Sequence, residues 1–250
     1  MSILLDYLNN HILADRLLVP EESLAHAVWN GVLRKEEVAA QLYAALVSRG
    51  IVVDHEIVER LGAVMAELTG QSLSCSHLSH RMGLPPKEVL KMLGVAELAG
   101  MWRHITSFDR SDTEVEDKSK GYLYDAGLAA ELLGVASPAE LDQHRSWGAL
   151  FETFVVNRLF RVMPVDCKLF YWRTADGMAE VDVILQRGSV LYPIEIKSTI
   201  HASLSNAKKI AVFNDLYAGL YTVAPGLIVY AGSRIYPLGA NVFAVSWAAL

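Results

Sequence analysis

Residues 179–199, AEVDVILQRGSVLYPIEIKST, constrain the fold of this chain more than any other stretch, because two apolar runs flank a short polar turn. Runs rich in Val, Ile and Leu are typical of β-strands, and the glycine in QRGS suits a tight hairpin turn. Acidic residues and a lysine lie inside both runs, although burying a charged side chain without a partner is costly. The sequence therefore predicts a β-hairpin whose charged side chains are either exposed on one face or gathered in a metal site.

The register of this hairpin decides which charged side chains meet. With Arg187–Gly188 as the turn, Asp182 lies opposite Pro193, and Glu180 lies opposite Glu195. Side chains alternate between the faces of a strand. One face is then expected to carry all the charged residues, which are Glu180, Asp182, Glu195 and Lys197, and the other face is expected to carry Val181, Val183, Ile194 and Ile196. The diagonal from Asp182 to Glu195 would span about 7 to 8 Å, near enough for both carboxylates to bind one ion.

A helix is expected over residues 146–163, SWGALFETFVVNRLFRVM, and it contains one acidic residue on its apolar face. At 100° per residue, Glu152 lies in the centre of that face, between Val155 and Val156. A carboxylate in this position must face the body of the domain and needs a cation or hydrogen-bond donors. An ion pair with Lys197 could satisfy it. A divalent metal ion held jointly by Glu152, Asp182 and Glu195 would do so more completely, because Mg²⁺ favours a few carboxylates together with water.

This arrangement of acids points to phosphodiester hydrolysis. A divalent ion lowers the pKa of a bound water and stabilises the charge that builds on a phosphate. Lys197, two residues after Glu195 on the same face, would hold the attacking water or neutralise the scissile phosphoryl oxygens. Asp…Glu-x-Lys alone is a loose pattern, and the inward Glu152 strengthens it. The sequence predicts Mg²⁺ or Mn²⁺ as cofactor, metal ligands at Glu152, Asp182 and Glu195, and a catalytic set formed by Glu152, Asp182, Glu195 and Lys197.

The first half of the chain is expected to be mainly helical. Residues 1–70 contain apolar residues at helical spacing, and SLSCSHLSHRMGLPPKEVLKMLG predicts two further short helices, the second opened by Pro85 and Pro86. MWRHITSF and GYLYD then predict two strands on either side of the polar loop DRSDTEVEDKSK. Three helices followed by a strand pair is the order of a winged helix.

Two features of this winged-helix-like segment bear on function. The cluster Cys75, His77 and His80 has neither a fourth ligand nor a paired spacing, which argues against a metal site. The second helix of the segment contains both lysines and glutamates, so a role in helical packing or dimerisation is favoured over recognition of DNA by this helix.

The second half of the chain is predicted to be α/β. After a Ser-Pro turn, a helix, three strands, a helix at about 202–213 and two more strands follow, which favours a mixed sheet flanked by helices. We place the boundary so that 1–135 form the helical and winged-helix-like domain and 136–250 the α/β domain.

The charge of the chain is divided unevenly between its two parts. The first 140 residues contain twelve basic and twenty acidic residues, a net charge of −8, and residues 141–250 contain ten and eight, a net charge of +2. Such asymmetry suggests two modules with different roles, although the second part is not basic enough to be assigned to DNA binding on charge alone.

Composition favours a folded protein of the reducing cytoplasm. The chain has 250 residues, of which 52% are hydrophobic, and no uninterrupted apolar run is long enough to cross a bilayer. The first residues contain Asp6 and no basic residue, which is a poor signal peptide. The two cysteines, Cys75 and Cys167, lie far apart and predict no disulfide framework. We therefore expect a cytoplasmic protein with no membrane segment.

Two sets of motifs in the chain resemble known families. VDVIL…YPIEIKST with an upstream helical glutamate resembles the PD-(D/E)xK nuclease superfamily, whose core is a restriction-endonuclease-like mixed sheet flanked by helices. KSKGYLYDAGLAAELLG, GALFETFVVNRL, FYWRTADGMAEVDVIL and YPIEIKST together resemble an uncharacterised C-terminal domain fused to AAA+ ATPases in many bacteria and archaea. That resemblance covers residues from about 60 to 250 and includes a winged-helix-like unit before a nuclease-like domain.

The resemblance implies Glu152 as the helix acid, Asp182 as the strand acid, and Glu195 with Lys197 as the ExK pair. Glu180 matches the acid that precedes the aspartate and is expected to act behind the metal ligands. No G-x-x-x-x-G-K-[ST] motif occurs in the chain, so ATP-linked chemistry is not expected from it.

Two function classes remain open from the sequence. The leading hypothesis is a metal-dependent nuclease acting on DNA or RNA, with Arg173, Lys208 and Lys209 as candidate phosphate contacts, although surface solvation is the simpler explanation for each. The alternative is a catalytically silent interaction or regulatory module that retains its carboxylates as a buried polar network. Its partner would be an AAA+ ATPase, a nucleic acid or a second copy of the chain.

Overall fold

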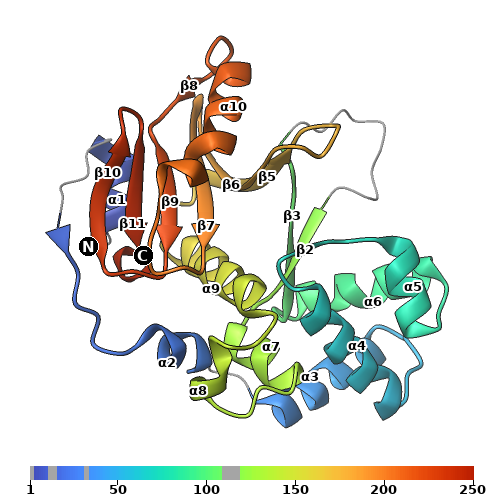
Figure 1. The fold of residues 1–250 in the computed structure, drawn as a ribbon. Coiled ribbons are helices and arrows are strands. Elements are labelled where there is room, and N and C mark those ends of the chain that lie inside the picture. The colour runs from blue at the N-terminus through green and yellow to red at the C-terminus, as the bar shows by residue number, and fades with distance from the viewer. Residues whose placement is uncertain (1–2, 11–15, 31–33, 109–118) are drawn as a thin grey trace. The chain divides into compact units, whose positions relative to one another are not determined.

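A computed structural model describes residues 3–10, 16–30, 34–108 and 119–250 of the chain (Figure 1). Contacts between Cα atoms divide the chain into two compact units that are discontinuous in sequence. The sheet unit comprises Met1–Ser23, Thr106–Arg110 and Val155–Leu250, and the helical unit comprises Leu24–Ile105 and Ser111–Phe154. Because the units interleave along the chain, a strand and a helix each contribute residues to both. The predicted boundary near residue 135 stays a prediction.

Within the described residues, the helical unit consists of helices and three strand segments. Its elements are α2 (Leu24–Trp29), α3 (Lys35–Ser48), α4 (His55–Leu68), β2 (Gln71–Ser72), α5 (Cys75–Met82), α6 (Pro86–Leu98), the first residues of β3 (Trp102–Ser107), β4 (Ser119–Leu123), α7 (Ala126–Leu132), α8 (Pro138–Leu141) and the first half of α9 (Trp147–Val162). Strand β2 pairs antiparallel with β4, with Gln71 opposite Gly121. Most of the predicted polar loop, residues 109–118, lies outside the described residues, and its last two residues, Ser119 and Lys120, begin β4 instead.

Aspartate side chains cap the starts of α4 and α7 in this unit. The carboxylate of Asp54 accepts a hydrogen bond from Ile57 N–H at 2.8 Å at the start of α4, and Asp125 accepts one from Leu128 N–H at 2.9 Å at the start of α7. These caps satisfy backbone donors that have no partner within the helix. The apolar residues of α4 repeat at helical spacing and are buried: Val58, Leu61, Val64, Met65 and Leu68. The predicted helix over this segment is therefore confirmed.

The sheet unit has a mixed sheet. Its elements are α1 (Ile3–Asn10), β1 (Arg16–Leu17), β5 (Cys167–Arg173), β6 (Glu180–Arg187), β7 (Val190–Lys197), η1 (Leu204–Ala207), α10 (Lys208–Tyr217), β8 (Thr222–Val223), β9 (Gly226–Tyr230), β10 (Arg234–Gly239), β11 (Val242–Ser246), η2 (Trp247–Ala249) and the ends of β3 and α9. The strand order is β1-β10-β11-β9-β7-β6-β5. Strands β7, β9 and β11 run parallel to one another, whereas β5, β6 and β7 are successively antiparallel. This confirms the predicted mixed α/β sheet flanked by helices (Figure 1).

Helix α10 packs closely on one face of this sheet. Ile210 and Phe213 of α10 are fully buried and share a core cluster with Trp172, Ile184 and others of the sheet. The rings of Phe213 and Trp172 meet edge to face at 5.3 Å between centroids. A Cβ atom at Gly226 would lie 2.6 Å from Ile210 Cγ2, so glycine at the start of β9 allows the helix to approach. This packing fixes the position of every side chain that α10 directs at the sheet.

The hairpin of β6 and β7 forms as expected but in a different register. Arg187 pairs with Val190, so the two-residue turn is Gly188–Ser189 rather than Arg187–Gly188, and Gly188 has a φ of 59°. A positive φ at this position is typical of tight hairpin turns and favours glycine. Moving the turn by one residue shifts the partners by two. Since Val183 pairs with Ile194, continuing this register brings Asp182 level with Glu195 rather than Pro193.

A β-bulge in β6 makes the predicted face of Val181 wrong. Phe170 pairs with Ile184 and Trp172 with Val181, so β6 has one more residue than β5 between these pairs. Val181 consequently shares the core cluster of Ile184 and α10 instead of facing the opposite side of the sheet, as strict alternation would require. Bulges of this kind redirect side chains locally and occur often beside functional sites. The extra residue falls at Asp182–Val183.

Among the described residues, no helix is both long enough and apolar enough to cross a membrane.

Candidate functional site

The centre of the candidate site is Glu195, a fully buried carboxylate on β7. Its Oε1 atom lies 2.5 Å from Lys197 Nζ and 3.4 Å from Lys209 Nζ, which reaches it from α10. Its Oε2 atom is buried and has no hydrogen-bond partner in the part of the chain that the structure describes. Buried polar atoms are almost always hydrogen-bonded, so an orphaned carboxylate oxygen indicates a place where an unseen group can bind. The Oε1 atom of this carboxylate thus contacts two ammonium groups, whereas Oε2 contacts none of the described donors.

Asp182 lies beside Glu195 on the neighbouring strand. Its Oδ2 atom accepts a hydrogen bond from the backbone N–H of Ile196 at 2.8 Å, and Lys197 Nζ lies 4.0 Å from the same oxygen. Lys197 therefore bridges the two acids, with its side chain 29% exposed. The two-residue change in register preserves the face on which the acids lie, because side chains alternate with period two. The structure brings together Asp182, Glu195, Lys197 and Lys209.

Burial shifts the acidity of Glu195. Desolvation raises the pKa of its carboxyl above the ordinary value, and the neighbouring Asp182 carboxylate raises it further. Lys197 and Lys209 act in the opposite direction but do not cancel the rise. Because this pKa is raised, the charged form of Glu195 is stabilised less than it would be in water. A cation arriving at Oε2 would supply the missing stabilisation.

Glu180 is paired with one of the predicted phosphate-binding residues. Arg173 Nε lies 3.7 Å from Glu180 Oε2, and the two residues are cross-strand partners on β5 and β6. Half of the Arg173 side chain remains exposed, at 49%. The roles of Arg173 in phosphate contact and of Glu180 behind the metal ligands stay predictions.

The two lysines of SNAKKI have different surroundings. Both lie in the first turn of α10, as the sequence predicted, but Lys208 is exposed whereas Lys209 contacts Glu195. The sequence predicted both as phosphate contacts at the start of a helix beside the site, but it did not predict that Lys209 would pair with Glu195. That connection depends on the packing of α10, which the order of residues does not reveal.

Glu152 is held within the helical unit by two residues of β4. Its Oε1 atom accepts hydrogen bonds from Tyr122 Oη at 2.8 Å and from Lys120 Nζ at 3.2 Å. The Glu152 and Lys120 side chains are only 15% and 5% exposed. The expectation that a carboxylate on this helix face needs a cation or hydrogen-bond donors is met by Lys120 and Tyr122, which the sequence did not single out. The role of Glu152 as a third metal ligand stays a prediction.

The donor atoms of the sheet unit fit a hard divalent cation. Among the described residues, no group of three or more His, Cys, Asp or Glu side chains is placed to hold a metal ion by itself. Mg²⁺, however, is usually bound by only one or two carboxylates together with water and substrate phosphate. The orphaned Glu195 Oε2 and the adjacent Asp182 carboxylate supply such a pair of oxygen donors.

These features define a mixed α/β chain whose central hairpin carries two buried carboxylates, Asp182 and Glu195, beside Lys197 of the hairpin and Lys209 of α10. Residues 147–250 match a family described as a domain of unknown function (DUF4143), and residues 33–139 match a second domain of unknown function (DUF8612). Each match covers less than half of the chain. The first agrees with the predicted resemblance to an uncharacterised domain.

Two curated relatives are similar to most of the chain. They are uncharacterized proteins of Mycobacterium bovis and Mycobacterium tuberculosis, each 27% identical over 201 residues. The aligned region is 80% of this chain but 44% of each relative, so the chain spans less than half the length of the curated relatives it matches.

Proposed function

We propose that this chain is a divalent-metal-dependent phosphodiesterase of nuclease type, with Asp182, Glu195 and Lys197 at its centre. The observation that supports the proposal is the buried, unpartnered Oε2 of Glu195 beside the Asp182 carboxylate. A site that served only as a polar network would be expected to satisfy both carboxylate oxygens. The leftover oxygen argues for a cation that completes the site.

The protein groups of the site have separable roles in this proposal. Asp182 and Glu195 would hold Mg²⁺ or Mn²⁺ through their carboxylate oxygen atoms, among them the buried Oε2 of Glu195. When bound, such an ion supplies Lewis-acid stabilisation of the charge on a phosphoryl oxygen and lowers the pKa of water. The backbone N–H of Ile196 fixes the Asp182 carboxylate, so that its orientation does not depend on the ion.

Lys197 would act on the substrate in this proposal. Its ammonium lies between the two acids and its side chain is 29% exposed, so it can bind a scissile phosphate oxygen or orient the attacking water without leaving its partners. Lys209 also helps to balance the negative charge of Glu195, so Lys197 can contact the substrate as well. We assign Lys209 to positioning and Lys197 to catalysis.

The fold of each unit agrees with a nucleic-acid enzyme. The helical unit has the element order α4, β2, α5, α6, β3, β4, with β2 paired to β4, which is the order of a winged helix. The sheet unit has a carboxylate-bearing hairpin inside a mixed sheet, as in a restriction-endonuclease-like, PD-(D/E)xK core. We propose DNA or RNA as the substrate, with Arg173 and Lys208 as exposed phosphate contacts.

The alternative is a silent module that binds a protein or nucleic acid. It is favoured by the contacts of Lys197 and Lys209 with Glu195, since two lysines neutralise much of the acid cluster without any ion. In that case the carboxylates would serve as a buried polar network, and the partner would be an AAA+ ATPase or a second copy of the chain.

A cleavage assay tests the proposal. Supercoiled plasmid, linear duplex, single-stranded DNA and single-stranded RNA are each incubated with the protein in Mg²⁺, Mn²⁺ or EDTA. We expect metal-dependent cleavage by the wild type that is lost in Asp182→Asn and Lys197→Ala and retained in Asp215→Asn, which makes the same acid-to-amide change at an exposed residue of α10 outside the site. If folded wild-type protein cleaves none of these substrates with either metal, the silent module is the better account.

A further inference from the structure

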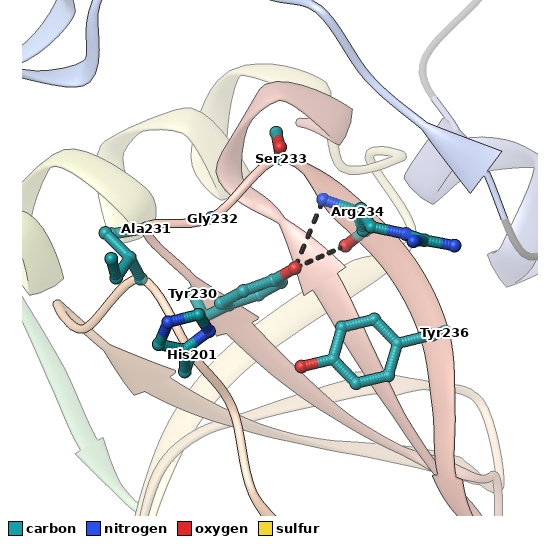
Figure 2. Close-up of a pocket in the computed structure, with 8 residues that line it drawn as sticks. His201, Tyr230, Ala231, Gly232, Ser233, Arg234 and Tyr236 are labelled. Carbon is teal, nitrogen blue, oxygen red and sulfur yellow. Dashed lines mark hydrogen bonds between the residues drawn. The ribbon is translucent and has the colours of Figure 1, made fainter.

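The sheet unit contains a pocket of about 750 Å³ where β7 and β9 end. Figure 2 shows its lining, which is formed by the segment after β7 and by the turn from β9 into β10. Its ring-bearing residues are His201, Tyr230 and Tyr236, and Arg234 provides a cationic side chain. The volume is within the range of roughly 300 to 1,000 Å³ that is typical of small-molecule sites.

Backbone hydrogen bonds hold the two tyrosine rings of the pocket in place. The Tyr230 hydroxyl donates to Arg234 O at 3.0 Å and accepts from Arg234 N–H at 3.1 Å, as the dashed lines in Figure 2 mark. The Tyr236 hydroxyl donates to Ala202 O at 3.1 Å. The ring centroids lie 6.0 Å apart with planes at 87°. Because both hydroxyls are hydrogen-bonded to the backbone, the two rings are held in fixed positions and form an aromatic wall of the pocket.

Glycine is required in the wall beside Tyr230. A Cβ atom at Gly232 would lie 2.3 Å from Cε2 of the Tyr230 ring and 2.7 Å from Ile200 O. Distances this short are not tolerated without movement of the backbone, so only glycine fits between the ring and the segment after β7. The rim next to it is apolar and open, since Ile200 is 67% exposed.

The pocket adjoins the end of β7 that carries Lys197. Lys197 and Tyr230 are Cα partners in the parallel pairing of β7 with β9. The N–H of Ala231, a lining residue, donates to Lys197 O at 3.2 Å and to Thr199 O at 3.1 Å. Neighbouring residues of paired strands direct their side chains to the same face of a sheet. Tyr230 and the candidate catalytic lysine are therefore on the same face.

We infer that this pocket binds an unstacked nucleobase that flanks the phosphate contacted by Lys197, so that the substrate is single-stranded nucleic acid or a frayed end. The inference rests on the proposed function. Aromatic side chains bind single strands by stacking on bases, with little dependence on sequence, and a nearby arginine adds cationic attraction. Bases inside a duplex are stacked on each other and cannot enter a pocket without being extruded, which costs free energy.

The test measures binding without metal, so that it does not depend on cleavage. Fluorescence anisotropy compares a labelled oligothymidylate with a blunt duplex of equal length in EDTA, using the full chain. We expect the wild type to prefer the single strand. Tyr236→Ala should weaken single-strand binding by roughly five- to a hundredfold, the range for loss of one stacked base. Tyr236→Phe retains the ring and should stay within about twofold of the wild type if stacking dominates.

A second variant keeps the test decisive if Tyr236→Ala fails to fold. Ile200→Glu adds a negative charge at the exposed rim and should weaken single-strand binding, whereas Leu220→Glu makes the same charge change at a residue outside the pocket that is 76% exposed and should not. Equal affinity for single strand and duplex, or equal effects of the two glutamate variants, would overturn the inference. Metal-dependent cleavage without single-strand preference would leave the proposed function standing and reject only the base pocket. Base binding without cleavage would reject the nuclease and retain the pocket.

Discussion

The buried ion pair between Glu152 and Lys120 allows the stability of the helical unit to be predicted. Glu152 Oε1 accepts hydrogen bonds from Lys120 Nζ at 3.2 Å and Tyr122 Oη at 2.8 Å, and the two charged side chains are 15% and 5% exposed. Removing one partner of a buried ion pair costs about 3 to 5 kcal/mol, because the other charge stays buried. Since Glu152 keeps some contact with solvent, we expect Glu152→Ala to lower the free energy of unfolding by about 3 kcal/mol, the lower end of that range.

Conservative changes at the same carboxylate separate its charge from its hydrogen bonds. Glu152→Gln retains an oxygen that can accept from the Tyr122 hydroxyl but loses the charge opposite Lys120, so we expect a loss of about 1 to 2 kcal/mol. Combining Glu152→Gln with Lys120→Met removes both charges. The double variant should be more stable than the sum of the single variants predicts, because neither charge is then left buried opposite a neutral group.

Urea denaturation followed by circular dichroism in EDTA measures these differences with no metal bound. Glu56→Ala is the matched control, because Glu56 also pairs with a basic residue, Arg60, but is 76% exposed. Exposed pairs of this kind contribute about 0 to 1 kcal/mol. If Glu152→Ala is as mild as Glu56→Ala, the carboxylate of Glu152 is not held by Lys120 and the reasoning is refuted.

Two further predictions concern the sheet unit. The pKa of Glu195 is raised in the folded protein, mainly by burial and also by Asp182, so its proton is bound more tightly in the folded state than in the unfolded state. The bound proton therefore stabilises the folded state below the ordinary glutamate pKa of 4.5, and this stabilisation is lost as pH rises through the folded pKa. In EDTA, Glu195→Gln should therefore be more stable than the wild type at neutral pH. Thermal melts should show this gap narrowing as pH falls from the folded pKa towards about 4.5 and changing little below that pH. A gap that widens on acidification would contradict this. Gly226→Ala places a Cβ atom 2.6 Å from Ile210 and should lower the free energy of unfolding by about 1 to 3 kcal/mol in denaturation measurements. Gly219→Ala is the control, because its Cβ atom would have no atom within 4 Å, and it should change the free energy of unfolding little. Similar losses of stability in both variants would rule out close packing as the cause.

The hairpin shows how far the sequence alone can specify a site. Apolar runs and a glycine-containing turn predicted two paired strands, and Asp182 and Glu195 on these strands both lie near Lys197. The exact turn was predicted one residue too early, because Arg187–Gly188 and Gly188–Ser189 both offer a glycine and nothing local distinguishes them. The error shifted the partners by two residues, so Asp182 and Glu195 kept their common face. The bulge at Asp182 depends on pairing with β5 and could not be predicted from β6 itself.

The partners of the buried charges were harder to predict than the charges themselves. Helical periodicity placed Glu152 on an inward face, which its low exposure confirms. Lys120 was assigned to a polar loop because the residues before it are charged, yet it lies on a strand with its side chain 5% exposed. Surface solvation was likewise the simpler explanation for Lys209 from the sequence, but the packing of α10 on the sheet brings it to Glu195. Such contacts join segments distant in sequence, and only tertiary packing determines them.

Titration of Mn²⁺ into the metal-free protein by isothermal calorimetry tests most directly whether the Glu195 and Asp182 carboxylates bind a divalent cation. The wild type and Lys208→Ala, whose change lies at an exposed residue of α10, should give the same saturable binding, and Glu195→Gln should bind far more weakly because it lacks the buried anionic oxygen. Binding that is unchanged in Glu195→Gln, or absent from the wild type, would contradict the proposed site.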